Sequence, residues 1–206
     1  MKKMIMSLGI LFFAATAVNA APVTLNFDDL PHGMIINGLD YYGLIFDGPD
    51  AIRVMYGNEL ASGTSSAPYS IAAGSLGMGE FRVVFPELVA FVGITAGDAG
   101  GDTDSYRIDV YGETDDLLAS FESGIFGGNP EVTSGFFGDS VTGSISLLDP
   151  LISYAWFTPT SASNSGISWD DLVYDTVPTA VPEPSPLFLF GTGLVGIGVF
   201  RRKFKG

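Results

Sequence analysis

The chain has no cysteine and a single histidine, His32, among its 206 residues. The absence of cysteine excludes disulfides, thiolate metal sites and cysteine nucleophiles. One histidine excludes a metal site built from several histidines, and His32 is expected at the surface in a turn. Positive charge is scarce as well, because residues 21–178 carry 22 acidic side chains against three arginines, a formal charge of −19. So acidic a surface repels nucleic acid and anionic lipid, and suits a divalent cation or solubility outside the cell.

A sustained helical period is also missing from the middle of the chain. Short apolar or alternating runs recur there, separated by Gly, Pro, Asn, Asp and Ser, as is typical of β-strands joined by turns. In one of them Tyr106, Ile108 and Val110 alternate with polar neighbours, which is the pattern of a half-buried strand. The pattern predicts an all-β fold, a single β-sandwich or jelly-roll-like domain over residues 21–176. The expected strands cover residues 23–27, 43–46, 52–56, 70–72, 81–85, 89–95, 105–111, 117–122, 143–148, 152–157 and 167–174.

The first 20 residues have the composition of a signal peptide. Two lysines are followed by an apolar stretch over residues 4–17 and by the small-residue sequence Val-Asn-Ala, which ends at Ala20. This order predicts export through the general secretion machinery, with cleavage after Ala20. A retained N-terminal anchor is the alternative.

The other end of the chain has three parts in a fixed order. A Pro-rich linker over residues 177–186 contains the triplet Pro182-Glu183-Pro184, an apolar segment follows at 187–200, and a basic tail at 201–206 begins with Arg201 and Arg202. As a helix the 14 apolar residues would span roughly 21 Å, which is short for a bilayer core of about 30 Å unless neighbouring residues extend it. The basic tail is expected to stay cytoplasmic, because clustered cations stop translocation. An ordinary C-terminal anchor is the alternative.

This tail resembles that of the PEP-CTERM family of exported bacterial proteins. The resemblance implies that an exosortase in the inner membrane recognises the triplet and processes the protein during export, in a context of exopolysaccharide production. The protein would be anchored transiently by its apolar segment and would finish at the cell surface or outside the cell. Residues 25–30, 42–46 and 167–174 also resemble the opening, second and closing strands of sandwiches in this family, which implies that the first and last strands are neighbours.

Two groups of carboxylates are candidate calcium ligands. Asp98, Asp102 and Asp104 lie within a glycine-rich stretch, residues 97–104, where flexible backbone and hard oxygens suit Ca²⁺. The alternative for this stretch is a solvated hairpin between the strands at 89–95 and 105–111. Asp28 and Asp170 form the second group, and Asp28 could share a structural Ca²⁺ with Asp170 or Asp171 if the first and last strands pair. The alternative is that both are turn residues at strand ends.

Aromatic residues are the remaining feature. A sugar-stacking surface could be drawn from Tyr41, Tyr42, Tyr56, Tyr69, Tyr154, Trp156 and Trp169, although sheets use the same residues in their cores. Trp156 is expected in the core. The sequence therefore predicts a non-enzymatic surface or matrix protein, without catalytic residues, that binds polysaccharide. The alternatives are a secreted polysaccharide hydrolase using paired carboxylates and a purely structural matrix protein.

Overall fold

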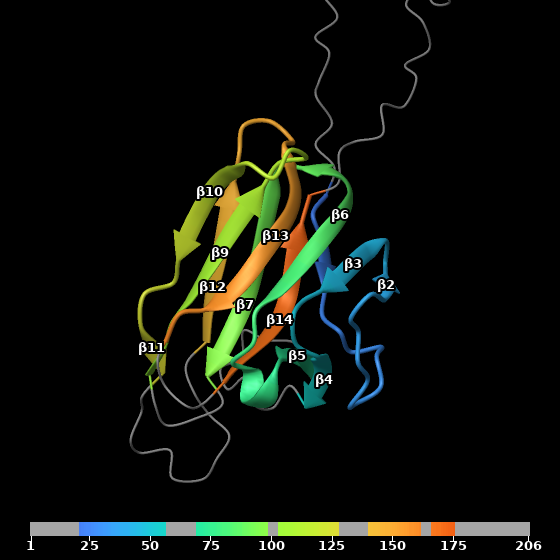
Figure 1. Ribbon diagram of the computed structural model, residues 1–206, viewed down its shortest axis with the longest axis vertical. Coiled ribbons are helices and arrows are strands. Elements are labelled where there is room, and N and C mark those ends of the chain that lie inside the picture. The colour runs from blue at the N-terminus through green and yellow to red at the C-terminus, as the bar shows by residue number, and fades with distance from the viewer. Residues whose placement is uncertain (1–20, 57–68, 99–102, 128–139, 162–165, 176–206) are drawn as a thin grey trace, which may run out of the picture. The chain divides into compact units, whose positions relative to one another are not determined.

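The computed structural model describes residues 21–56, 69–98, 103–127, 140–161 and 166–175, and these form two β-sheets packed face to face (Figure 1). All of them fall within one compact unit, Ala20–Val177. The prediction of an all-β sandwich is confirmed. Apart from strands, the described residues contain one short 3₁₀ helix, η2 (Ser75–Gly77).

Sheet A has six strands. Five follow the order β12 (Ser140–Ser146), β7 (Phe91–Asp98), β14 (Ile167–Tyr174), β5 (Tyr69–Ala73) and β4 (Ile52–Tyr56). The sixth, β1 (Val23–Leu25), pairs antiparallel with the last residues of β14, so the predicted neighbourhood of the first and last strands is confirmed. Because β7 occupies one edge of β14, strands β1 and β5 lie end to end along its other edge.

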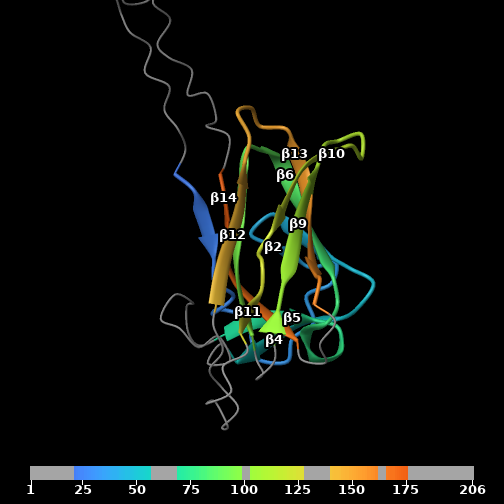
Figure 2. The same cartoon turned by 90° about the vertical axis from the view of Figure 1, so that its left-hand side faces the viewer.

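Sheet B is the second layer, and Figure 2 shows the two layers edge-on. Its order is β10 (Leu117–Glu122), β9 (Tyr106–Tyr111), β13 (Ile152–Pro159), β6 (Phe81–Val89), β3 (Leu44–Asp47) and β2 (Asp40–Tyr41). Two further short strands, β8 (Thr103–Asp104) and β11 (Phe126–Gly127), pair only with each other.

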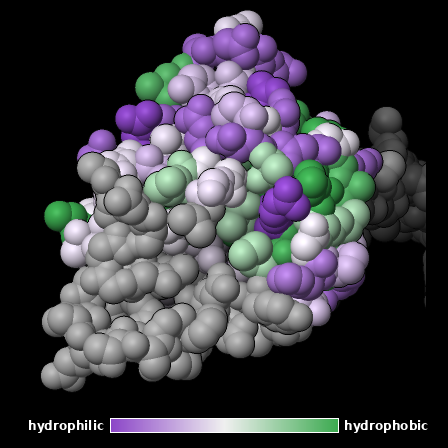
Figure 3. All heavy atoms as spheres, turned by 60° about the horizontal axis from the view of Figure 1, so that its bottom comes forward, coloured by the Kyte–Doolittle hydropathy of each residue, from purple (hydrophilic) through white to green (hydrophobic). Residues whose placement is uncertain are grey.

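The core between the sheets is built around Trp169 of β14. Its fully buried indole meets Phe81, Phe157 and Tyr106 edge-on, with ring centroids 5.5, 6.0 and 5.1 Å away. Alternation along β9 supplies Tyr106, Ile108 and Val110 to the same core, as the sequence pattern predicts. Burial of apolar area at about 25 cal/mol per Å² makes this cluster the main source of stability in a chain without disulfides. Figure 3, which brings the end with β4 and β5 forward, shows hydrophilic residues over much of the described surface around a smaller apolar patch.

Residues 97–104 do not join two neighbouring strands of a hairpin. Strand β7 before them belongs to sheet A and β9 after them to sheet B, so the chain crosses here from one layer to the other. The hairpin alternative is therefore wrong. Periodicity shows that both strands are half or fully buried, but it does not show which sheet each one joins.

The predicted strand at 81–85 is longer in the structure because β6 continues through Pro86 to Val89. The pairing of β6 with β13 shifts register here: Ile152 lies opposite Val89, whereas Tyr154 lies opposite Val84. Proline lacks the amide that a regular ladder needs, and a bulge is where a sheet tolerates it.

Several predicted features lie outside the described residues: the signal peptide (1–20), the linker with its triplet (177–186), the apolar segment (187–200) and the basic tail (201–206). Within the residues that the structure describes, no helix is long and apolar enough to cross a membrane.

Candidate functional site

The outer side of sheet B carries a row of aromatic and charged side chains. In the sheet register Trp156 of β13 lies between Arg82 of β6 and Asp109 of β9, and Tyr154 lies next to Tyr111. Ala155 and Phe157, which alternate with these residues, are fully buried, so Tyr154 and Trp156 point away from the core. We call this surface, made by Tyr111, Tyr154, Trp156 and Arg82, the aromatic face.

The prediction that Trp156 belongs to the core is wrong. Tyr154 and Trp156 are half-buried, whereas Trp169 is the buried tryptophan. The alternation that removes Trp156 from the core was visible in the sequence. Which of the two alternating sets faces inward is decided by Ala155 and Phe157, because both fit against Trp169 and its neighbours.

The rings of the aromatic face form a row, which we call the ladder, and the Arg82 guanidinium lies beside two of them. Tyr111 and Tyr154 stack with centroids 4.9 Å apart and planes inclined by 8°. The Arg82 guanidinium carbon lies 5.4 Å from the Tyr154 centroid and 5.7 Å from that of Trp156. Both distances are within the range of cation–π attraction, worth about 0.5–1 kcal/mol at exposed sites. The arginine therefore links the two outward-pointing aromatic residues of β13.

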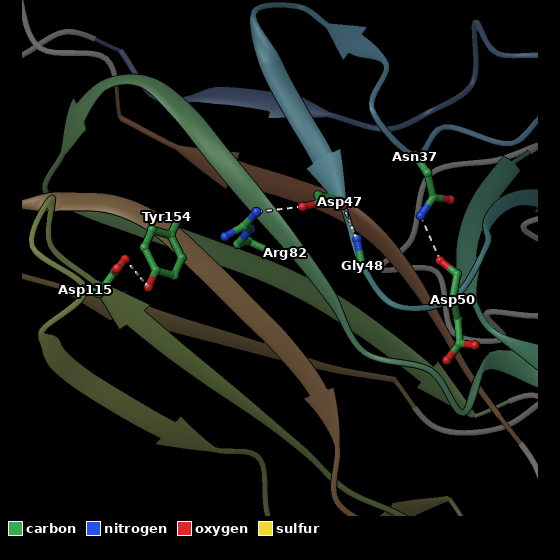
Figure 4. Close-up of polar contacts among 7 residues, drawn as sticks. All are labelled: Asn37, Asp47, Gly48, Asp50, Arg82, Asp115 and Tyr154. Carbon is green, nitrogen blue, oxygen red and sulfur yellow. Dashed lines mark hydrogen bonds and ion pairs between the residues drawn. The ribbon is translucent and has the colours of Figure 1, made fainter.

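Arg82 is also held by a carboxylate from the next strand. Its Nη2 lies 2.6 Å from Oδ2 of Asp47 at the end of β3 (Figure 4). The amide of Gly48 donates to the other oxygen, Oδ1, at 2.9 Å. Gly48 is required here, since a Cβ on it would lie 2.9 Å from the carbonyl oxygen of Glu80. Asp47 thus has both oxygens engaged and fixes the guanidinium beside the rings.

A second arginine–aspartate pair lies further along the same face. Nε of Arg107 is 2.7 Å from Oδ2 of Asp109, whose other oxygen accepts a hydrogen bond from the Ser120 hydroxyl. At the opposite end of the row the Tyr154 hydroxyl donates to Asp115 at 3.0 Å (Figure 4). Asp115 adopts a left-handed φ of 61° in the β9–β10 turn, a conformation that aspartate tolerates better than most residues.

Taken together, the aromatic face offers flat rings flanked by fixed donors and acceptors. Rings bind the apolar faces of a ligand, and carboxylate and guanidinium groups accept and donate hydrogen bonds at defined positions. Sequence reasoning named Tyr154 and Trp156 among the aromatics but missed Arg82, Asp47, Tyr111 and Asp109. The sequence did contain a signal. All three arginines of this acidic domain lie in predicted strands, and two of them directly follow an aromatic residue.

The first predicted calcium group is not brought together among the described residues. Asp104 lies in β8, fully buried, and its Oδ1 accepts a hydrogen bond from Ser161 at 2.7 Å. Asp102 lies outside the described residues, as does the side chain of Asp98 at the end of β7. Within the described parts of the chain, no three Asp, Glu or His side chains lie close enough together to hold a metal ion.

The two residues of the second group, Asp28 and Asp170, both lie beside β5. Asp28 accepts the amide of Tyr69 on Oδ1 and the Asn26 side chain on Oδ2, both at 2.9 Å. Asp170 is fully buried with its Oδ1 2.7 Å from the amide of Asp171; the sheet register places it opposite Thr95 of β7, and its neighbour Trp169 opposite Ile71 of β5. The hydroxyl of Ser70 is buried and has no hydrogen-bond partner among the described residues.

A groove of about 460 Å³ lies between β1 and β2, lined by Asp28, Asp29, Tyr41, Tyr42 and residues 23–26. Asp29 accepts hydrogen bonds from the hydroxyls of Tyr41 at 2.5 Å and Tyr42 at 3.0 Å. The bond from Tyr41 lowers the pKa of Asp29, and burial raises the pKa of the Tyr41 hydroxyl. A carboxyl kept ionised in this way is an acceptor and not a proton donor.

Residues 180–203 match the PEP-CTERM protein-sorting motif. The chain carries a PEP-CTERM sorting motif. The predicted resemblance of the tail is therefore confirmed, and the motif implies export and sorting to the cell surface. No curated protein matches the chain.

Solved structures with a similar arrangement of strands include adhesin and carbohydrate-binding domains. The K2 cleaved adhesin domain of Lys-gingipain has a TM-score of 0.49 and 10% identity, covering 76% of this chain and 100% of that one. The K1 domain from Porphyromonas gingivalis W83 has a TM-score of 0.49 and 11% identity over 75% and 97%. A family 29 carbohydrate-binding module from Piromyces equi has a TM-score of 0.43 and 14% identity over 77% and 92%. None of these likenesses transfers a ligand or a role to this chain.

Proposed function

We propose that this PEP-CTERM protein is a non-enzymatic surface or matrix component that binds polysaccharide through the aromatic face. The observation that carries the proposal is the ladder of Tyr111, Tyr154, Arg82 and Trp156 on the outer side of sheet B. These residues come from three neighbouring strands, β6, β9 and β13, and lie together outside the core. Sugars match such a surface, since they present apolar ring faces and hydroxyls at their edges.

Binding is favoured over hydrolysis by the state of the carboxylates. Glycoside hydrolysis requires one carboxyl with a raised pKa to protonate the leaving group. In the groove beside β1 the pKa of Asp29 is lowered instead. On the aromatic face Asp47 and Asp109 are each paired with an arginine.

The sorting tail is expected to fail when its charge is reversed. Changing Arg201, Arg202, Lys203 and Lys205 to glutamate removes the electrostatic stop, so the apolar segment should slip through the membrane and processing by the exosortase should fall. Immunoblots of membrane and surface fractions measure both effects. The control is Arg53→Glu, which reverses a charge at an exposed position of β4, outside the tail. Unchanged sorting of the tail variant would contradict the role of the basic residues.

We also propose that calcium stabilises the sandwich at Asp28 and Asp170. The buried carboxylate of Asp170, the buried hydroxyl of Ser70 and the domain charge of −19 all favour a cation beside β5. Calcium would supply structural charge neutralisation there and no chemistry.

A thermal melt of the full chain in detergent tests this. A cation that binds only the folded state adds about 2.7 kcal/mol at 100 times its dissociation constant. We therefore expect a melting temperature several degrees higher in millimolar calcium than in EDTA, with a smaller gain in magnesium. Asp170→Asn should abolish the gain and Asp102→Asn should preserve it. Identical melts in EDTA and calcium would contradict the proposal.

A further inference from the structure

We infer that the aromatic face selects neutral polysaccharide chains and rejects acidic ones, an inference that rests on the proposed binding function. Its basis is the way in which the charges of this face are paired. The usual expectation for arginines on a glycan-binding surface is the opposite, because guanidinium groups bind carboxylates and phosphates well.

Neither arginine of this face presents an unpaired charge. Arg82 lies 2.6 Å from Asp47, and Arg107 lies 2.7 Å from Asp109. The described residues contain one other arginine, Arg53, which belongs to β4 in sheet A, and no lysine. An acidic sugar would therefore find no cation on the described part of this face that is not already neutralised by an aspartate.

Negative charges outnumber positive ones on this face. The strands of sheet B that carry the row, and the turns beside them, hold two guanidinium groups and a larger number of carboxylates. The carboxylates belong to Asp47, Glu80, Asp109, Asp115 and Glu122. A uronate or phosphate placed among them would meet like charge, which costs several kcal/mol when the groups are juxtaposed. The formal charge of −19 over residues 21–178 adds a longer-range repulsion that also slows the approach of a polyanion.

Neutral sugars avoid both costs and can use both partners of the Arg82–Asp47 pair, whose side chains are partly exposed. A hydroxyl can donate to a carboxylate oxygen and accept from a guanidinium, so adjacent hydroxyls on one ring match an Arg–Asp pair without any net charge. The pairs are fixed before the ligand arrives: Asp47 by Gly48 and Asp109 by Ser120. Groups that are already ordered lose little entropy on binding.

The test compares neutral and acidic polysaccharides on the unmodified protein. The full chain in detergent is passed over immobilised mannan, xyloglucan and hydroxyethylcellulose, and over polygalacturonate and alginate, at about 20 mM and about 200 mM NaCl, where screening lengths differ severalfold. We expect at least one neutral chain to bind at least tenfold more tightly than either acidic one, with an affinity that changes little with salt.

The Asp47→Asn variant sharpens the test. It keeps the size of the side chain but leaves the Arg82 charge unneutralised, so binding to polygalacturonate should rise roughly tenfold at low salt and fall again at high salt. Asp149→Asn makes the same change in net charge at an exposed turn position that is not part of the aromatic face, and should leave binding unchanged.

The outcomes separate the two claims. Tighter, salt-sensitive binding of the unmodified protein to the acidic chains would overturn the inference and keep the proposed function. Absence of binding to every polysaccharide in both panels would overturn the proposed function and the inference with it.

Discussion

Replacing Trp156 with alanine is expected to weaken polysaccharide binding at least tenfold while leaving the sandwich folded. A tryptophan at the centre of a binding surface is the kind of residue whose truncation costs about 2 kcal/mol or more. Trp156 is half-buried on the outer side of sheet B, beside Arg82 and away from the core. The substitution removes the largest flat surface available to a sugar ring and one of the two rings that hold Arg82 in place.

Binding of the variant is measured by calorimetry against whichever polysaccharide the unmodified protein binds. Leu148→Ala is the matched control, because Leu148 is a large apolar residue that is fully exposed in the turn after β12. The melting temperature of Trp156→Ala should change little, since an exposed cation–π contact contributes about 0.5–1 kcal/mol. Undiminished affinity in a folded Trp156→Ala protein would contradict the assignment of the aromatic face.

Tryptophan fluorescence locates the ligand independently, because the chain has only two tryptophans. In Trp169→Phe the remaining indole, Trp156, should change its emission when polysaccharide binds. In Trp156→Phe the remaining indole, Trp169, is fully buried and should not respond. A response from Trp169 alone would place the ligand elsewhere on the molecule.

The fold could be read from the sequence because its signals are local. Turn residues at short intervals and alternation such as Tyr106, Ile108 and Val110 depend on neighbours in the chain, and the structure buries these three side chains as predicted. The pairing of β1 with β14 was reached differently, by the resemblance of the chain ends to known sandwiches. Where a prediction depended on which strands become partners, as for the hairpin at 97–104, local signals were insufficient and the prediction failed.

The aromatic face could not be read from the sequence for the same reason. Arg82 and Asp47 are 35 positions apart, and Arg82 and Trp156 meet only because β6 and β13 are adjacent in sheet B. Trp156 was expected in the core because it alternates with Tyr154 along an apolar strand. Its position was decided by Phe157, which fills the space beside Phe81 at a centroid distance of 5.0 Å and forces its neighbour outward.

The largest expected loss of stability follows from replacing Trp169 with alanine. This side chain is fully buried at the centre of the sandwich and touches three other buried aromatic rings. Truncating a buried tryptophan removes its transfer free energy and leaves a cavity, which together cost about 3–5 kcal/mol. For a domain that is typically stable by about 5–15 kcal/mol, this is a large fraction of the total.

Trp169→Phe separates packing from polarity at this position. The indole Nε1 of Trp169 is buried and has no hydrogen-bond partner among the described residues. A buried donor without a partner costs about 1–3 kcal/mol, and phenylalanine removes it while keeping a ring against Phe81 and Phe157. We therefore expect Trp169→Phe to lose clearly less stability than Trp169→Ala, as measured by urea denaturation of both variants beside Trp156→Ala.

Equal losses for the two Trp169 variants would mean that the volume of the indole alone decides its contribution. A loss for Trp156→Ala as large as that for Trp169→Ala would show that the aromatic face belongs to the stabilising core after all.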